Sequence, residues 1–239
     1  MSEAREAARQ VATGQPSALG RTWLLRLMIA VAILFAADTI LVTSQPYLFF
    51  DIPVELWVQS VNWGPLVYLM DATNWSAGIY QTGLGMLVCA AMFLWDRRAG
   101  WLMLVGSVAS LLDQVLKATV GRHRPSADLV TILTPSNGYS YPSGHAVFFT
   151  WLAFMLAAAV APRLHPRLRL VVWALAGLLI FAACLGRVWI GVHWPSDVLG
   201  GFLLGLGWSA FVLWLPERYL PSPDRVWSRW RDRGRPMAA

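Results

Sequence analysis

Six apolar stretches recur along the chain, separated by shorter and more polar connections. They cover residues 23–42, 77–94, 100–116, 145–160, 170–187 and 198–215. Each is close to the length of about 20 residues that a helix needs to cross the hydrocarbon core of a bilayer. The connection 43–76 is rich in aromatic and apolar residues, which predicts one or two short interfacial helices. The pattern predicts an all-α polytopic membrane protein, a bundle of six transmembrane helices with short interfacial helices on the outer face.

The overall composition supports a membrane setting. Of the 239 residues, 57% are hydrophobic and only 13% are charged, whereas charged residues make up about a quarter of a typical soluble domain. Both cysteines fall in predicted spans, so no disulfide framework is expected. We therefore expect three parts: a cytoplasmic N-terminal segment (1–22), a six-span domain (23–215) and a basic cytoplasmic tail (216–239).

Arginines are distributed unevenly between the two sides that six spans would create. Those in the N-terminal segment, in the second-to-third and fourth-to-fifth connections and in the tail all fall on one side. Because cytoplasmic loops accumulate Lys and Arg, both termini are expected in the cytoplasm. The formal charge of +6 and the pI near 9.9 are explained by attraction to anionic inner-leaflet lipid, so no nucleic-acid partner is expected.

The opposite side holds only four cations: Lys117, Arg122, Arg124 and Arg187, of which Lys117 is the only lysine in the chain. All four belong to three short polar blocks. A charge retained at the end of a span is costly and by default indicates function. The sequence therefore predicts that the chemistry takes place at the extracytoplasmic face.

The first block reads KATVGRHRP and begins at Lys117. Lys117 and Arg124 are seven residues, or two helical turns, apart, so both can face one polar pocket if the third span continues in near-helical form past Gly121. Asp113 lies one turn before Lys117, at a spacing that lets a carboxylate hold an ammonium group. The alternative is a structural pair of Asp113 and Lys117, with Arg122 and Arg124 merely at the headgroup surface.

The second block is Pro142-Ser143-Gly144-His145, and a helix is expected to start near His145. A hydroxyl and free backbone N–H groups would then converge at the positive end of a helix, where phosphate oxygens bind readily. Gly144 would allow close approach of the backbone to a ligand, and His145 can exchange a proton near neutral pH. The alternative is a turn with an ordinary helix cap.

The third block places Arg187 at the outer end of the fifth span and His193 in the loop before the sixth. Pro195 suits the first turn of a helix, which puts Asp197 in that turn and close to a ring nitrogen of His193. A histidine held by a carboxylate keeps its other nitrogen free as a nucleophile or base. The alternative is a purely structural His–Asp pair.

The three cations decide between two kinds of ligand. His145, His193 and Asp197 could hold a metal ion, but they share their expected pocket with Lys117, Arg124 and Arg187. A phosphate group explains those cations and a divalent ion does not. We therefore expect a phosphate site with no metal and no cofactor.

The blocks resemble the signature of the type 2 phosphatidic acid phosphatases, which is K-x6-RP, PSGH and SR-x5-H-x3-D. Here the signature reads Lys117-x6-Arg124-Pro125, Pro142-Ser143-Gly144-His145 and Arg187-x5-His193-x3-Asp197. The match covers order, spacing and residue type. One position departs from it, because Gly186 stands where the family has serine, and a hydroxyl contact is lost there.

The resemblance implies a role for each matched residue. His193 would be the nucleophile, Asp197 its orienter and His145 the acid that protonates the leaving oxygen. The residues that would bind the phosphate oxygens are Lys117, Arg124, Ser143, Gly144 and Arg187. Arg122 and His123 fall inside the first motif but outside its fixed positions, so at most a headgroup role is expected. Asp38, in the first span, could face the pocket or serve helix packing.

By resemblance, the six-span domain is a metal-independent lipid phosphatase that works through a phosphohistidine intermediate. The expected substrate is a lipid phosphate or diphosphate in the outer leaflet of a bacterial inner membrane, of the undecaprenyl diphosphate, phosphatidylglycerophosphate or phosphatidate type. Undecaprenyl diphosphate is the first candidate. One alternative is a phosphotransferase using the same site, for example on lipid A. Another is a lipid-headgroup binding or transport protein without chemistry. The oligomeric state does not follow from the sequence.

Overall fold

The computed structural model describes residues 18–215, and within that range every regular element is a helix. The elements are α2 (Ala18–Ser44), α3 (Asp51–Ser60), α4 (Leu66–Trp75), α5 (Ile79–Trp95), α6 (Arg97–Gly106), α7 (Val108–Val120), α8 (Gly144–Val160), the 3₁₀ helix η1 (Ala161–Arg163), α9 (Pro166–Trp189) and α10 (Pro195–Trp214). The predicted all-α fold is confirmed. The predicted tail 216–239, and residues 1–17 of the predicted N-terminal segment, lie outside the described residues.

Five helical stretches of the described part are long and apolar enough to cross a membrane: Gly20–Ser44, Arg97–Val120, Gly144–Arg163, Pro166–Trp189 and Pro195–Trp214. A sixth span exists only if α4 and α5, which meet at an angle of 94°, are counted as one bent span. The predicted second span corresponds to α5, which at 17 residues is shorter than the other candidate spans. The predicted third span consists of two helices, α6 and α7.

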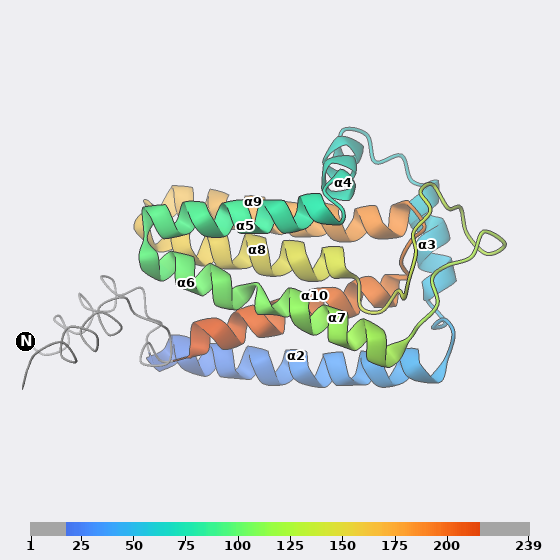
Figure 1. Ribbon diagram of the computed structural model, residues 1–239, viewed down its shortest axis with the longest axis horizontal. Coiled ribbons are helices and arrows are strands. Elements are labelled where there is room, and N and C mark those ends of the chain that lie inside the picture. The colour runs from blue at the N-terminus through green and yellow to red at the C-terminus, as the bar shows by residue number, and fades with distance from the viewer. Residues whose placement is uncertain (1–17, 216–239) are drawn as a thin grey trace, which may run out of the picture.

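The predicted interfacial helices correspond to α3 and α4. Both lie at the end of the bundle that also carries the long connection 121–143 (Figure 1). One face of α3 is buried through Asp51, Glu55 and Val58, so this helix is part of the packed structure rather than a loose surface element.

Helix α8 forms the centre of the bundle and packs against α6, α7, α9 and α10 (Figure 1). Its sequence is apolar all round, as a helix with neighbours on every side requires. Small residues of α10 let the two helices approach closely. A Cβ atom at Gly201 would lie 2.5 Å from the Ser143 carbonyl oxygen, and one at Gly205 would lie 2.8 Å from the Val147 carbonyl oxygen. Side chains at these two positions would therefore force α8 and α10 apart.

Helices α2 and α9 expose large apolar side chains at the outside of the bundle. Ile33 of α2 is 64% exposed and Leu170 of α9 is 73% exposed. A bilayer explains this surface, because hydrocarbon chains would cover these side chains. The molecule is thus an integral membrane protein whose packed core surrounds α8.

Candidate active site

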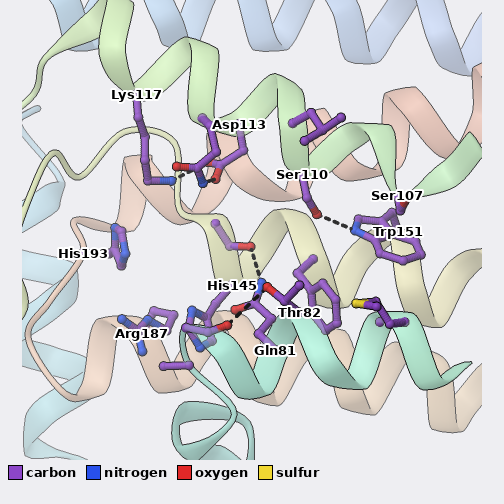
Figure 2. Close-up of a pocket in the computed structure, with 18 of the residues that line it drawn as sticks. Gln81, Thr82, Ser107, Ser110, Asp113, Lys117, His145, Trp151, Arg187 and His193 are labelled. Atoms are coloured by element: carbon purple, nitrogen blue, oxygen red, sulfur yellow. Dashed lines mark hydrogen bonds and ion pairs between the residues drawn. The ribbon is translucent and has the colours of Figure 1, made fainter. Parts of the chain in front are cut away.

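A cavity of about 710 Å³ lies among α5, α7 and α8 and reaches the connection 121–143. Six of the eight predicted site residues line it: Lys117, Arg124, Gly144, His145, Arg187 and His193. Figure 2 shows Lys117, His193, Arg187 and His145 at one end of this cavity. The other two, Ser143 and Asp197, are fully buried and do not line the cavity. The three sequence blocks therefore meet in one place.

The two ring nitrogens of His193 have different surroundings. Nε2 lies 3.1 Å from Arg124 Nη1. Nδ1 lies 3.6 Å from Asp197 Oδ2, which is too far for a hydrogen bond, and has no hydrogen-bond partner within residues 18–215. Because a guanidinium group can only donate hydrogen bonds, Nε2 accepts and the ring proton is assigned to Nδ1 on the Asp197 side. This tautomer leaves a lone pair on the nitrogen that faces Arg124 and the cavity.

The electrostatic surroundings keep His193 neutral. The side chain is buried, and burial together with the nearby Arg187, Arg124 and Lys117 cations holds the pKa of His193 well below its usual value. A low pKa disfavours the imidazolium form. Nε2 is therefore unprotonated at neutral pH, and its lone pair accepts the hydrogen bond from Arg124. Arg124 has to release this hydrogen bond before Nε2 can form a bond to phosphorus.

Asp197 is fixed by a buried network that includes Asp51 and Ser196, whose side chains the sequence analysis did not single out. Its Oδ2 accepts a hydrogen bond from the Trp194 backbone N–H (2.9 Å), and its Oδ1 accepts one from Arg122 Nη1 (2.6 Å). Arg122 also donates through Nη2 to Asp51 Oδ2 (2.8 Å) and through Nη1 to Ser196 Oγ (2.7 Å). Asp51, Ser196 and Asp197 are fully buried.

The expected headgroup role of Arg122 is therefore wrong. Its side chain is buried between two carboxylates rather than at the surface. His123, by contrast, is exposed. One signal for this network was present in the sequence: Asp51 is an acid in an otherwise largely apolar connection, and a buried acid needs a cation.

Lys117 is held in place from two directions. It forms an ion pair with Asp113, one turn earlier on α7, and its ammonium group donates to the Pro142 carbonyl oxygen at 2.6 Å. Gly144 packs directly against this pair. A Cβ atom there would lie 2.9 Å from Asp113 Oδ2 and 3.3 Å from Lys117 Nζ.

The path from Lys117 to Arg124 differs from the expected one. Helix α7 ends at Val120, and Gly121 takes a left-handed conformation (φ +65°) that stops the helix. The condition of near-helical continuation past Gly121 is therefore not met, yet Lys117 and Arg124 both line the cavity. Arg124 reaches the cavity from the loop instead, where it donates to the backbone carbonyl oxygens of Val192 (2.6 Å) and Tyr139 (3.2 Å).

The start of α8 supplies two polar groups without partners in the structure. Ser143 is the N-cap residue, but its hydroxyl makes no capping hydrogen bond, so the alternative of an ordinary side-chain cap does not hold. Among the described residues, its buried Oγ has no hydrogen-bond partner, and neither has Nε2 of His145. Buried polar groups are normally paired. Both atoms therefore have hydrogen-bonding capacity left, and His145 lines the cavity where a ligand would bind, whereas Ser143 does not.

Arg187, in the last turn of α9, is 7% exposed and donates to Asn74 Oδ1 of α4 at 3.2 Å. Asn74 was not singled out by the sequence analysis. Asp38 accepts a hydrogen bond from the Tyr141 hydroxyl group (3.1 Å) and does not line the cavity, which agrees with the packing alternative.

The cavity changes character away from the cations. Uncharged polar side chains also line it, from Gln81, Thr82, Ser107, Ser110 and Gln114. The apolar part of the wall consists of Met86, Cys89, Leu104, Leu111, Phe148 and Trp151. Figure 2 shows Trp151 at the end opposite His193. The cavity therefore joins a cationic end to an apolar end.

Comparison with known proteins identifies the family. The sequence model of the PAP2 superfamily matches residues 98–220, which is more than half of the 239-residue chain. The chain belongs to the PAP2 superfamily. The matched region contains all eight predicted site residues.

Individual relatives agree with this PAP2 membership. The chain is 33% identical over 142 residues to phosphatidylglycerophosphatase B of Bacillus subtilis, a match covering 56% of this chain and 66% of that protein. It is 32% identical over 125 residues to undecaprenyl-diphosphatase of Sulfolobus acidocaldarius, covering 51% and 56%. The matches thus span between about half and two thirds of the length of these curated relatives.

The fold is also shared with solved PAP2 structures. The crystal structure of a transmembrane PAP2-type phosphatidylglycerolphosphate phosphatase from Bacillus subtilis superimposes with a TM-score of 0.61 at 22% identity, over 88% of this chain and 98% of that one. LpxE of Aquifex aeolicus gives a TM-score of 0.55 at 22% identity, over 70% and 96%. At this identity the likeness concerns the fold.

Proposed function

We propose that this PAP2 protein is a membrane phosphatase that hydrolyses a lipid phosphate or diphosphate through a phosphohistidine intermediate. The observation that carries the proposal is the setting of His193. Its Nε2 faces a cavity lined by Lys117, Arg124 and Arg187, while Asp197 lies next to its Nδ1. A neutral imidazole with one nitrogen oriented by a carboxylate is an activated nucleophile.

In the first step, the lone pair of His193 Nε2 forms a bond to phosphorus while the bond to the leaving oxygen breaks. Lys117, Arg124 and Arg187 stabilise the charge on the equatorial oxygens, which is the main requirement of phosphoryl transfer. The Ser143 hydroxyl and the Gly144 N–H group complete the phosphate site. Asp197 stabilises the positive charge that the imidazole ring acquires.

His145 supplies the proton that the leaving oxygen needs, since Nε2 of this residue is buried without a partner at the cavity wall. The negative phosphoryl group favours the protonated form of His145. In the second step, water gives a proton to His145 and attacks phosphorus. The nitrogen–phosphorus bond then breaks, its electron pair returns to His193, and inorganic phosphate leaves.

The shape of the cavity supports a lipid substrate. The phosphate occupies the cationic end, and the hydrocarbon chain follows the wall of Met86, Leu104 and Trp151. Relatives of the chain carry the names phosphatidylglycerophosphatase B, undecaprenyl-diphosphatase and lipid A 1-phosphatase. We take undecaprenyl diphosphate as the first substrate to test, in the outer leaflet of the membrane.

The decisive experiment measures phosphate release by the purified protein in detergent, from undecaprenyl diphosphate, phosphatidylglycerophosphate, phosphatidate and lipid A. Activity on at least one of these lipids should persist in EDTA, and His193→Ala should abolish it. Strict dependence on Mg²⁺, or full activity of the His193 variant, would rule the mechanism out. Loss of substrate without phosphate release would instead indicate transfer to an acceptor other than water.

The same substrate panel tests His145. A phosphate monoester such as phosphatidate expels an alkoxide, which needs a proton, whereas a diphosphate expels a phosphate monoester with a last pKa of roughly 6. General acid catalysis contributes about 10² to 10⁴ in rate. His145→Ala should therefore depress monoester hydrolysis far more than diphosphate hydrolysis. Equal losses on both would mean that His145 binds the phosphate rather than donating the proton.

A further inference from the structure

Among the cations of the site, Arg187 is held by a residue of α4, a helix that lies outside the sequence signature. Its guanidinium group donates from Nη1 to Asn74 Oδ1 at 3.2 Å, and its Nε has no hydrogen-bond partner in the part of the chain that the structure describes. Within residues 18–215, Asn74 is thus the hydrogen-bond partner of this side chain. Because the side chain is long and flexible, a guanidinium group without such a partner would lose its defined position.

Asn74 is itself anchored to the helix that carries Arg187. Its Nδ2 donates to the Gly186 backbone carbonyl oxygen at 3.4 Å, so its amide group bridges two consecutive residues of α9. Asn74 lies in the last turn of α4 and does not line the cavity. Any influence it has on a bound phosphoryl group must therefore act through Arg187.

The absence of a side chain at Gly186 makes this arrangement possible. A Cβ atom there would lie 3.2 Å from Asn74 Nδ2, 3.3 Å from Met70 Cβ and 3.4 Å from the Met70 carbonyl oxygen. Such distances are tighter than ordinary van der Waals contact. Gly186 stands where the type 2 phosphatidic acid phosphatases have serine, and here α4 occupies the space beside that position.

We propose that Asn74 is a positioning residue, which holds the Arg187 guanidinium group in the orientation that binds the phosphoryl group. In this chain an amide on α4 takes the place next to Arg187 that a side chain at position 186 would otherwise fill. The role rests on the proposed function only in that Arg187 binds the phosphoryl group. It assigns a function to α4, a helix that contributes no residue to the cavity wall.

The test compares Asn74→Ala with Asp71→Ala, a control on the exposed face of the same helix. The measurements are kcat/KM on the preferred lipid phosphate and the inhibition constant of inorganic phosphate. A hydrogen bond to a charged group is lost in Asn74→Ala, so kcat/KM should fall by roughly tenfold or more and inorganic phosphate should inhibit more weakly. Asp71→Ala should match the wild-type protein in both measurements.

A double-mutant cycle with Arg187→Lys separates positioning from a general structural role. The lysine ammonium keeps the charge but not the planar fork that Asn74 holds. If Asn74 acts through Arg187, adding Asn74→Ala to Arg187→Lys should cause little further loss. Losses that simply multiply in the double variant would show that Asn74 acts independently of Arg187, and would overturn the proposal.

The outcome also separates this role from the phosphatase function itself. If the wild-type protein is active and Asn74→Ala equals it in kcat/KM and in inhibition by inorganic phosphate, the positioning role is wrong and the phosphatase function stands. If the wild-type protein hydrolyses no lipid phosphate and does not bind inorganic phosphate, both proposals are wrong.

Discussion

Arg122 lies between two buried carboxylates, Asp51 and Asp197. In the described part of the chain, no lysine and no other arginine lies within ion-pair distance of either acid, and the further contact of Asp197 is with His193, which is neutral. Removing one partner of a buried ion pair leaves an uncompensated charge, which costs about 3–5 kcal/mol. Here the two acids would also repel each other. The stability of the site therefore depends on an arginine that does not line the cavity.

We expect Arg122→Gln to lower the thermal unfolding midpoint in detergent and to reduce kcat by roughly 10² or more, by analogy with the loss of one preorganised donor. The double variant Arg122→Gln/Asp51→Asn removes one of the two carboxylates. It should recover much of the stability but not the activity, because Asp197 still lacks its partner. A single Arg122→Gln variant with wild-type stability and kcat would contradict this account.

Glu55 is a buried acid of a different kind. It is 0% exposed, and neither carboxyl oxygen has a hydrogen-bond partner between residues 18 and 215. Burial and the nearby carboxylates of Asp197 and Asp51 raise the pKa of Glu55 from 4.5 to about 9. Because the folded protein holds this proton more tightly than the unfolded chain does, the stabilisation is complete below pH 4.5 and is lost as pH rises towards 9.

Replacing Glu55 by glutamine should remove this pH dependence. The stability advantage of Glu55→Gln over wild type should grow between pH 6 and pH 9, on the order of 1 kcal/mol per pH unit. The measurement is the unfolding midpoint in detergent at several pH values, with Asp71→Asn as an exposed control. Parallel pH profiles for Glu55→Gln and wild type would show that Glu55 titrates normally.

Single residues show which parts of the site could be predicted from the sequence. Asp113 and Lys117 are four positions apart on one helix, and Asp197 follows Pro195 into the first turn of α10, so local helix geometry sets both relationships. The contacts Arg122–Asp51 and Arg187–Asn74 join residues 71 and 113 positions apart. These contacts arise only when α3 and α4 dock on the bundle, which no local spacing indicates.

At the scale of whole helices, Gly144 controls how closely α8 approaches α7. A Cβ atom at this position would lie 2.9 Å from Asp113 Oδ2 and 3.3 Å from Lys117 Nζ. Helix α8 begins at this residue, so its first turn cannot move away without disturbing the rest of the core around it. The Asp113–Lys117 pair would have to move instead.

Gly144→Ala should therefore displace Lys117 and lower kcat/KM by roughly 10², comparable with the loss of one positioned donor. The matched control is Gly177→Ala on α9, where a Cβ atom would meet nothing within 4 Å. That variant should keep full activity and gain slightly in stability, because alanine favours a helix interior by about 1 kcal/mol over glycine. Similar activity for Gly144→Ala and Gly177→Ala would refute the close-packing argument.

The hydrophobic pattern alone does not predict where each helix begins, bends or ends. It correctly predicted that every apolar stretch is helical, because apolar content and length are enough to identify a membrane-spanning helix. It did not reveal the 94° bend between α4 and α5, the break between α6 and α7, or the end of α7 at Gly121. These features depend on backbone geometry and on packing partners, so an apolar sequence continues across them unchanged.

The whole molecule has two chemically different ends. Lys117, Arg122, Arg124 and Arg187 lie at the end with α3 and the loop 121–143, whereas the turns between α5 and α6 and between α8 and α9 lie at the other end (Figure 1). Arg163 joins those two turns through an ion pair with Asp96 at 2.6 Å. The arginines of those turns are thus separated along the bundle from the cations that line the cavity.

This separation predicts that the cavity end is extracytoplasmic, because Lys and Arg accumulate in cytoplasmic connections. Single cysteines at two exposed positions test it: Ser126→Cys in the loop at the cavity end and Arg97→Cys at the opposite end. The background carries Cys89→Ala and Cys184→Ala and must retain activity. In intact cells, a membrane-impermeant maleimide should label the cysteine at position 126 and spare the one at 97. After the membranes are disrupted, both should react. Labelling of position 97 alone in intact cells would reverse the orientation and place the phosphate site on the cytoplasmic side.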